Sequence, residues 1–158
     1  MTELDVLRFS LTSALPKVGR YWRRTARDLV LAHGISEACA MPLISIGRMG
    51  DGVRQVAVAE EIGVEGPSLV RLLDQLCASG LVERRDDAAD RRAKTLWLTP
   101  EGRRITGEIE RGLVVLRAQV LRDVARGDLE ATLRVFRAFE EAVGRAQEAP
   151  QQPGEPVA

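Results

Sequence analysis

A stripe of hydrogen-bonding side chains lies along one predicted helix near the middle of the chain. Ser68, Arg71 and Gln75 are spaced at i, i+3 and i+7, which places them on the same side of an α-helix. Short or forked polar groups in such a stripe can hydrogen-bond to the edges of base pairs in a DNA major groove. Asp74 lies beside the stripe. A carboxylate near phosphates is unfavourable unless it accepts a hydrogen bond from cytosine or pairs with an arginine. We expect the Asp74 carboxylate to hold Arg71.

The residues around this helix predict a helix-turn-helix. Gly66 and Pro67 fit the cap and the first helical position, because a proline there has no helical hydrogen bond to lose. A shorter amphipathic helix precedes them, from Val56 to Ile62, and Gly63 fits its left-handed end. Two helices joined by a turn of three or four residues that contains glycine describe a helix-turn-helix.

A basic hairpin is predicted directly after the two helices. Downstream of Gly80 the hydrophobic period changes to about two, which indicates two strands and a charged turn. A hairpin with a structural role alone more often turns on Asn-Gly or Asp-Gly. The order of helix, turn, helix and hairpin therefore favours a DNA-binding winged helix over an ordinary helical pair with a solvated hairpin. The basic residues crowded in this hairpin are Arg84, Arg85, Arg91, Arg92 and Lys94.

The run from Gly63 to Thr99 resembles the MarR family of bacterial transcription regulators, and most closely its SlyA-like branch. The resemblance is strongest in residues 67–71 and 90–94, and it continues more weakly from about Leu4 to Val143. It implies that the helix of residues 67–79 enters the major groove. It also implies that the wing reaches into the minor groove through Arg92, braced by Asp90. The DNA-binding residues expected from the pattern and the resemblance together are Pro67, Ser68, Arg71, Gln75, Arg84, Asp90, Arg91, Arg92 and Lys94.

These signals predict a mostly α-helical protein with a small β wing, as one domain over residues 1–147. Residues 52–99 would form the winged helix-turn-helix, between long dimerisation helices in residues 1–33 and 100–147. Apolar side chains recur at helical spacing in both terminal regions. One small domain does not need such helices, so packing against a twofold-related copy is their simplest use, and MarR-like proteins dimerise in this way.

Several helix boundaries also follow from the sequence. Pro16 predicts either a kink or a break in the first terminal region. Ser36 fits the cap of a helix that ends near Arg48, and residues 127–128 fit the stop before the last helix. Residues 148–158 contain three prolines and little apolar surface, which predicts a disordered tail.

Charge and composition restrict the class of protein. Lysine plus arginine and aspartate plus glutamate number 23 each, for a net charge of +0, so the strongly basic surface of many nucleic-acid-binding proteins is absent. Local placement of the cations must supply any attraction to DNA. A chain of 158 residues with 45% hydrophobic residues can bury a core. It has no apolar run near the roughly 20 residues of a membrane span and no visible signal peptide, which predicts a cytoplasmic protein.

No arrangement of residues predicts an enzyme, a cofactor or a metal site. The single histidine, His33, falls at a predicted helix end without a Ser/His/Asp order, a Gly-rich phosphate loop or metal-ligand spacing around it. Cys39 and Cys77 lie far apart and within apolar stretches, which favours buried thiols over a disulfide. A regulator that senses oxidants through a cysteine is the less favoured alternative.

Trp22 and Arg23 could bind a small ligand. An indole and a guanidinium together offer a stacking surface and a cation for an aromatic carboxylate such as salicylate. The pair resembles one in SlyA-like relatives, and MarR-like regulators commonly bind such acids between their dimerisation helices and the winged helix. The alternative is that Trp22 packs in a dimer core. We therefore expect a homodimeric, sequence-specific regulator on an inverted-repeat operator, with ligand release as a further hypothesis and a protein-interaction module as the alternative.

Overall fold

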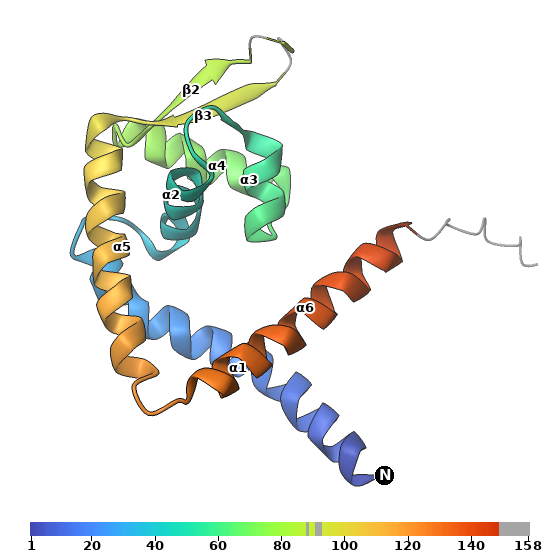
Figure 1. The fold of residues 1–158 in the computed structure, drawn as a ribbon. Coiled ribbons are helices and arrows are strands. Elements are labelled where there is room, and N and C mark those ends of the chain that lie inside the picture. The colour runs from blue at the N-terminus through green and yellow to red at the C-terminus, as the bar shows by residue number, and fades with distance from the viewer. Residues whose placement is uncertain (88, 91–92, 149–158) are drawn as a thin grey trace, which may run out of the picture. The chain divides into compact units, whose positions relative to one another are not determined.

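The computed structural model describes residues 1–87, 89–90 and 93–148, which form a mostly helical chain with one small sheet (Figure 1). The chain divides into two compact units, and the first ends at Arg117. The second unit holds the end of α5 and α6 (Arg126–Glu148). The first unit holds α1 (Glu3–Leu31), α2 (Glu37–Met49), β1 (Val53–Arg54), α3 (Gln55–Ile62), α4 (Gly66–Ala78), β2 (Val82–Asp86), β3 (Lys94–Leu98) and most of α5 (Pro100–Val120).

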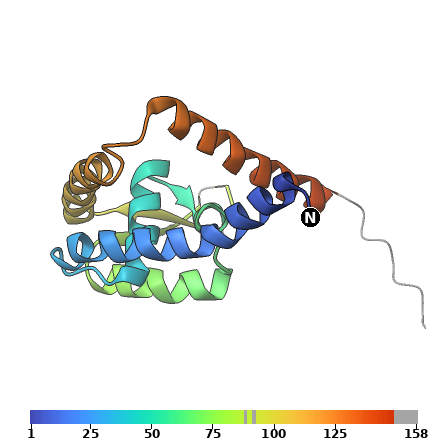
Figure 2. The same ribbon diagram turned by 90° about the horizontal axis from the view of Figure 1, so that it is seen from below.

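The first helix, α1, is continuous over 29 residues (Figures 1 and 2). It begins with a capping box, in which the Thr2 hydroxyl accepts from the backbone of Asp5 and the Asp5 carboxylate accepts from the backbone of Thr2. Pro16 lies inside the helix. The break considered for this position does not occur, because a proline removes one backbone hydrogen bond and the turns on both sides keep theirs.

The helix ends of the helix-turn-helix agree with the sequence to within one residue. Ser36 caps α2 by accepting from the backbone of Cys39, as predicted. Gly63 ends α3 with φ +68° and ψ +38°, the left-handed conformation expected there. The cap of α4 is Glu65, which precedes the predicted cap, and Pro67 falls second in the helix. A proline is tolerated at either position, since the first backbone N–H groups of a helix have no helical partner.

The sheet has three antiparallel strands in the order β1-β3-β2. In the hairpin, Val82 lies opposite Leu98 and Asp86 opposite Lys94. The first strand, β1, pairs with β3, and its two residues, Val53 and Arg54, both lie opposite residues of β3. The sequence predicted the hairpin and missed this third strand, because two residues are too few to show a period.

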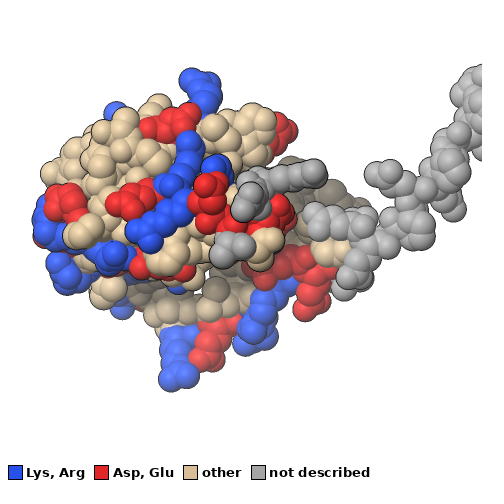
Figure 3. Space-filling view, turned by 90° about the horizontal axis from the view of Figure 1, so that it is seen from above, with Lys and Arg blue, Asp and Glu red and all other residues tan. Residues whose placement is uncertain are grey.

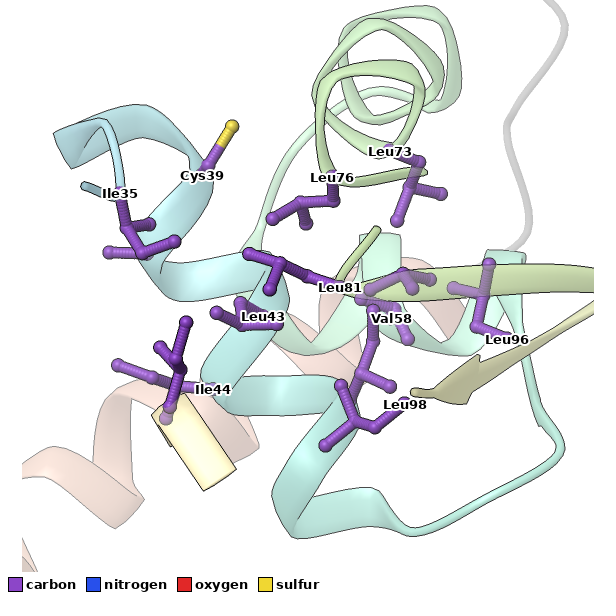
Figure 4. Packing of buried hydrophobic residues seen from close by; sticks show 14 of the residues in the cluster. Ile35, Cys39, Leu43, Ile44, Val58, Leu73, Leu76, Leu81, Leu96 and Leu98 are labelled. Carbon is purple, nitrogen blue, oxygen red and sulfur yellow. The ribbon is translucent and has the colours of Figure 1, made fainter. Parts of the chain in front are cut away.

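A hydrophobic core joins α2, α3, α4 and the sheet (Figure 4). Figure 4 shows Leu73 and Leu76 of α4 on the side of α2 where Leu43 lies, and all three side chains are almost completely buried. Leucine at these positions removes one face of α4 from solvent, which fixes the opposite face outward.

The start of α5 is attached to the turn between α4 and β2. The hydroxyl of Thr99 donates a hydrogen bond to the carbonyl oxygen of Gly80, at 2.7 Å. The Thr99 hydroxyl oxygen also accepts from the backbone N–H of Gly102, at 2.9 Å. A Cβ atom on Gly102 would overlap the carbonyl oxygen of Leu81. The residue must therefore be glycine for α5 to approach the turn this closely.

In the second unit, α6 begins at Arg126, so residues 127–128 lie in its first turn. The prediction that these residues stop the preceding helix and cap the last one is wrong, because α5 already ends at Val120 and the carbonyl of Ala125 accepts from the backbone of Leu129, within α6. Glu148, the first residue of the predicted tail, is instead the last residue of α6, and the rest of that tail, residues 149–158, lies outside the described residues. No helix in the described part of the chain combines the length and the apolar character that a membrane span requires.

Candidate nucleic-acid interface

The outer face of α4, which we call the reading helix, presents the residues predicted to contact bases. Ser68 and Arg71 are exposed, and Pro67 is exposed at the start of the same helix. Within the described residues, Arg71 forms neither an ion pair nor a hydrogen bond, so its guanidinium is available to another molecule. Ser68 and Arg71 thus meet the first geometric requirement for reading a groove, which is projection away from the core.

Gln75 lies at the edge of this face that borders α2. Its side-chain oxygen lies 3.2 Å from the sulfur of Cys39, which donates to it across the two helices. The same thiol lies 3.8 Å from the carbonyl of Leu72. One end of the amide is thus engaged within the protein, whereas Arg71 is not.

The expected partner of Asp74 is corrected by the structure. Its carboxylate accepts from Arg84 of β2, at 2.5 Å, and Arg84 also donates to the carbonyl of Val70, at 2.9 Å. Arg71 takes no part in this contact. Arg84, predicted as a DNA contact, therefore ties the hairpin to the reading helix, and its side chain is 26% exposed.

The wing, which we define as β2, β3 and the turn between them, carries its described cations in contact with acids. Lys94 donates to Asp86, at 2.5 Å. Arg85 donates to Glu83, at 2.9 Å, and its guanidinium carbon lies 4.4 Å from the ring centre of Trp97. Figure 3 shows basic and acidic side chains intermixed on this side of the molecule, in keeping with the zero net charge. Asp90 is exposed, and Arg91 and Arg92 lie outside the described residues.

One acid in the turn of the wing has several partners. Arg54 donates to Oδ2 of Asp87, at 2.7 Å, and Oδ1 of Asp87 accepts from the backbone of Ala89, at 2.8 Å, and of Asp90, at 3.2 Å. The hydrogen bond from Arg54 is the largest cause that holds the pKa of Asp87 below its usual range, and the backbone donors act in the same direction. The sequence showed Asp87 only as an acid near the wing and gave no sign of Arg54 as its partner.

A cavity of about 170 Å³ in the first unit brings together the two residues predicted to bind a ligand. Trp22 and Arg23 of α1 both line it, with Arg27 one turn later and Arg48 and Arg117 on the facing helices. The guanidinium carbon of Arg117 lies 6.0 Å from the ring centre of Trp22. An aromatic surface inside a ring of arginines is suited to a small aromatic anion.

Two of these arginines share an acid. Arg48 donates from Nε to Glu110, at 2.6 Å, and Arg117 lies 3.8 Å from the other oxygen of the same carboxylate. Arg23 and Arg27 form no ion pair with any residue that the structure describes. The charge around the cavity is therefore only partly neutralised.

The remaining titratable candidates are structural. Cys39 is buried, and burial is the main cause that raises the pKa of the half-buried Cys77, outweighing the nearby Arg84. A thiol with a raised pKa forms less thiolate at neutral pH and reacts slowly with oxidants. His33 is half-buried, with Nδ1 3.4 Å from Glu108. No group of three metal-ligating side chains occurs within the ranges that the structure describes.

Known proteins share this fold and, in one case, a substantial part of the sequence. A sequence profile of the MarR family matches residues 33–93. The crystal structure of the transcriptional regulator PA3341 is 31% identical, covers 85% of this chain and 98% of its own, and has a TM-score of 0.79. The structure of the transcriptional regulator SlyA is 16% identical, with coverages of 87% and 96% and a TM-score of 0.77. Staphylococcus aureus MarR in complex with salicylate and kanamycin is also 16% identical, with coverages of 90% and 96% and a TM-score of 0.77.

Proposed function

Because this chain belongs to the MarR family of transcription regulators, whose members are not enzymes, we propose that it binds double-stranded DNA at a near-palindromic operator as a homodimer. The observation that carries this proposal is the outer face of the reading helix. Arg71 is exposed there beside Ser68, without a partner among the described residues, while Arg54, Arg84, Arg85 and Lys94 are all engaged with acids. A guanidinium that is left free at the centre of such a face is suited to a bidentate contact with guanine.

The two units supply apolar surfaces for a second copy. In the first unit, α1 leaves Leu7, Phe9 and Val18 more than half exposed. In the second unit, α6 leaves Leu133 and Val143 more than half exposed. Apolar surface repeated along two helices is unfavourable in water and is typical of an interface. We assign both helices to dimerisation, and twofold symmetry then requires an inverted repeat in the DNA. We place the protein in the cytoplasm, where a bacterial operator lies.

Selection of bound sequences from a random pool of duplexes tests this function. Enrichment of an inverted repeat supports a sequence-specific regulator. A folded dimer that enriches no sequence would instead be a winged-helix module that binds other proteins, because the reading face would then have no DNA partner.

The cavity beside Trp22 supports a second part of the proposal, which is release of DNA by a small aromatic carboxylate. The ring can stack on the indole, and the carboxylate can pair with Arg23 or Arg27, which form no ion pair with a described residue, although Glu37 also lines the cavity. About 170 Å³ is smaller than the ~300–1,000 Å³ typical of drug-sized ligands, which favours a ligand of the size of salicylate. Salicylate is bound in the structure of Staphylococcus aureus MarR. Titration of this protein with salicylate, with and without operator DNA, tests the assignment.

A further inference from the structure

The carboxylate of Asp87 connects two parts of the winged helix through its two oxygens. Oδ1 accepts from the backbone of Ala89 and Asp90 and so shapes the start of the turn in the wing. Oδ2 accepts from Arg54, which lies at the junction of β1 and α3. The Asp87 side chain is 11% exposed and the Arg54 side chain 49%, so the carboxylate is shielded from solvent while the guanidinium stays partly open to it.

Backbone pairing with β1 does not connect the outer part of the wing to α3. The strand β1 ends at Arg54, opposite Thr95, and the chain then enters α3. Beyond that level the described residues of the wing have no third strand beside them. Arg84 and Asp74 tie the wing to the reading helix closer to its base, since Arg84 lies opposite Leu96. Arg54 reaches Asp87, which lies beyond the last pair of the hairpin, Asp86 and Lys94.

From this geometry we propose that Arg54 and Asp87 are a positioning pair, which fixes the direction of the outer wing relative to α3 and the reading helix. This inference rests on the proposed DNA binding. It concerns the DNA that flanks the two half-sites contacted by the reading helices. A wing held in one direction meets the flanking backbone without first losing conformational freedom, and preorganisation of this kind increases affinity. The pair therefore determines how strongly the flanks contribute to binding.

The variant Asp87→Asn separates the two roles of the carboxylate. An asparagine keeps an oxygen that can accept from the turn, and its amide NH₂ group faces Arg54 donor to donor. Arg54→Gln removes the cation and leaves Asp87 in the turn. Arg85→Gln is the matched control, because it removes an arginine and an ion pair from the same sheet without touching the proposed pair.

The experiment compares two duplexes for each protein: the selected operator with its flanks, and the same half-sites without flanks. We expect Asp87→Asn and Arg54→Gln each to bind the long duplex about tenfold more weakly than the wild type. A loss of this size corresponds to about one or two phosphate contacts, summed over the two wings of a dimer at moderate salt. Both variants should bind the short duplex as the wild type does. The double variant should be no weaker than either single variant, and Arg85→Gln should behave as the wild type on both duplexes.

Each contrary outcome has a distinct meaning. Equal loss on both duplexes, with a lowered unfolding temperature, would overturn the proposal in favour of a general role in folding. Wild-type affinity of both variants for the long duplex would show that DNA, and not the pair, directs the wing. If the wild type enriches no duplex from the random pool, the proposed function itself is overturned. Arg54→Lys provides a rescue test, because it restores the charge and should recover part of the flank dependence.

Discussion

Arg84 in the wing and Asp74 on the reading helix form an ion pair, with Arg84 Nη1 2.5 Å from Asp74 Oδ1. A second nitrogen of Arg84 donates to the carbonyl of Val70, and its Nε is buried with no hydrogen-bond partner among the described residues. The guanidinium thus spans one helical turn of the reading helix. This contact pairs the carboxylate that lies three residues from Arg71 on the reading helix.

A double-mutant cycle can test the partner of Asp74. We expect Asp74→Ala and Arg84→Ala to couple in the free energy of unfolding by about 0.5–1 kcal/mol, because each loses the same exposed ion pair. Asp74→Ala and Arg71→Ala should be additive within about 0.3–0.5 kcal/mol. Urea unfolding of the wild type, the three single variants and the two double variants measures both values. Coupling to Arg71 in place of Arg84 would contradict the arrangement described here.

Arg71→Ala should weaken specific DNA binding and leave folding intact. Each good bidentate contact to a base is worth about 1–3 kcal/mol, and a dimer would lose two. Mobility-shift titration on the selected operator measures the loss. Arg111→Ala is the control, since Arg111 is also exposed, lies on α5 and has no ion pair among the described residues. An Arg71 variant that binds as tightly as the control would show that the outer face of α4 does not read DNA.

Sedimentation at micromolar concentration should give the mass of a dimer. The apolar side chains exposed along α1, and separately along α6, are of the kind that a protein interface buries. Twofold symmetry also predicts inverted half-sites about one helical turn, 10–10.5 base pairs, apart. A monomeric mass, or selection of direct repeats, contradicts this assembly.

Trp22→Ala should reduce salicylate affinity while the dimer still binds DNA without ligand. Binding linkage requires that DNA weaken salicylate binding by the same factor as salicylate weakens DNA binding. A tenfold effect corresponds to about 1.4 kcal/mol of coupling. Calorimetric titration in both orders measures the factor. Trp97→Phe is the control, because Trp97 lies in the sheet and outside the cavity. Dissociation of the Trp22 variant into monomers would place the indole in the dimer core instead.

Gly102→Ala should destabilise the first unit by about 1–3 kcal/mol, because the new methyl group overlaps the carbonyl of Leu81. Gly107→Ala in the same helix is the control, since its methyl group would meet only the end of Arg111, at 3.6 Å. That variant should be neutral or stabilising by up to about 1 kcal/mol through helix propensity. Thermal unfolding distinguishes the two. Equal effects would mean that the approach of α5 to the turn is not close in solution.

The sequence was sufficient for the winged helix because each of its elements carries a local signal. The spacing of leucines in α4, the left-handed Gly63 and the cap at Ser36 all depend on residues close together in the chain. These expectations are confirmed by the structure and the MarR fold to within one residue. The short strand β1 has no such signal, because two residues acquire a partner only after β3 is in place.

The partners of charged residues were harder to predict. Asp74 lies three residues from Arg71 and 10 from Arg84, so sequence proximity favoured the wrong arginine. The hydrogen bond between Arg54 and Asp87 joins residues 33 apart, and nothing in the spacing indicates it. Trp22 and Arg23 could be singled out because they are neighbours in sequence and resemble a pair in SlyA-like relatives, and their binding of a ligand stays a prediction. Arg48 and Arg117 join them at the cavity only through the tertiary fold.

The attachment of α5 at Thr99 and Gly102 has a mechanical consequence. The part of α5 in the first unit, residues 100–117, is about 27 Å long at 1.5 Å per residue. Its near end is held to the turn that follows the reading helix, so a displacement of its far end tilts α5 against that turn. A tilt of about 2° moves the far end, where Arg117 meets the cavity, by only about 1 Å. A ligand of the kind proposed for the cavity would therefore need to displace Arg117 by only about 1 Å to tilt α5 against that turn.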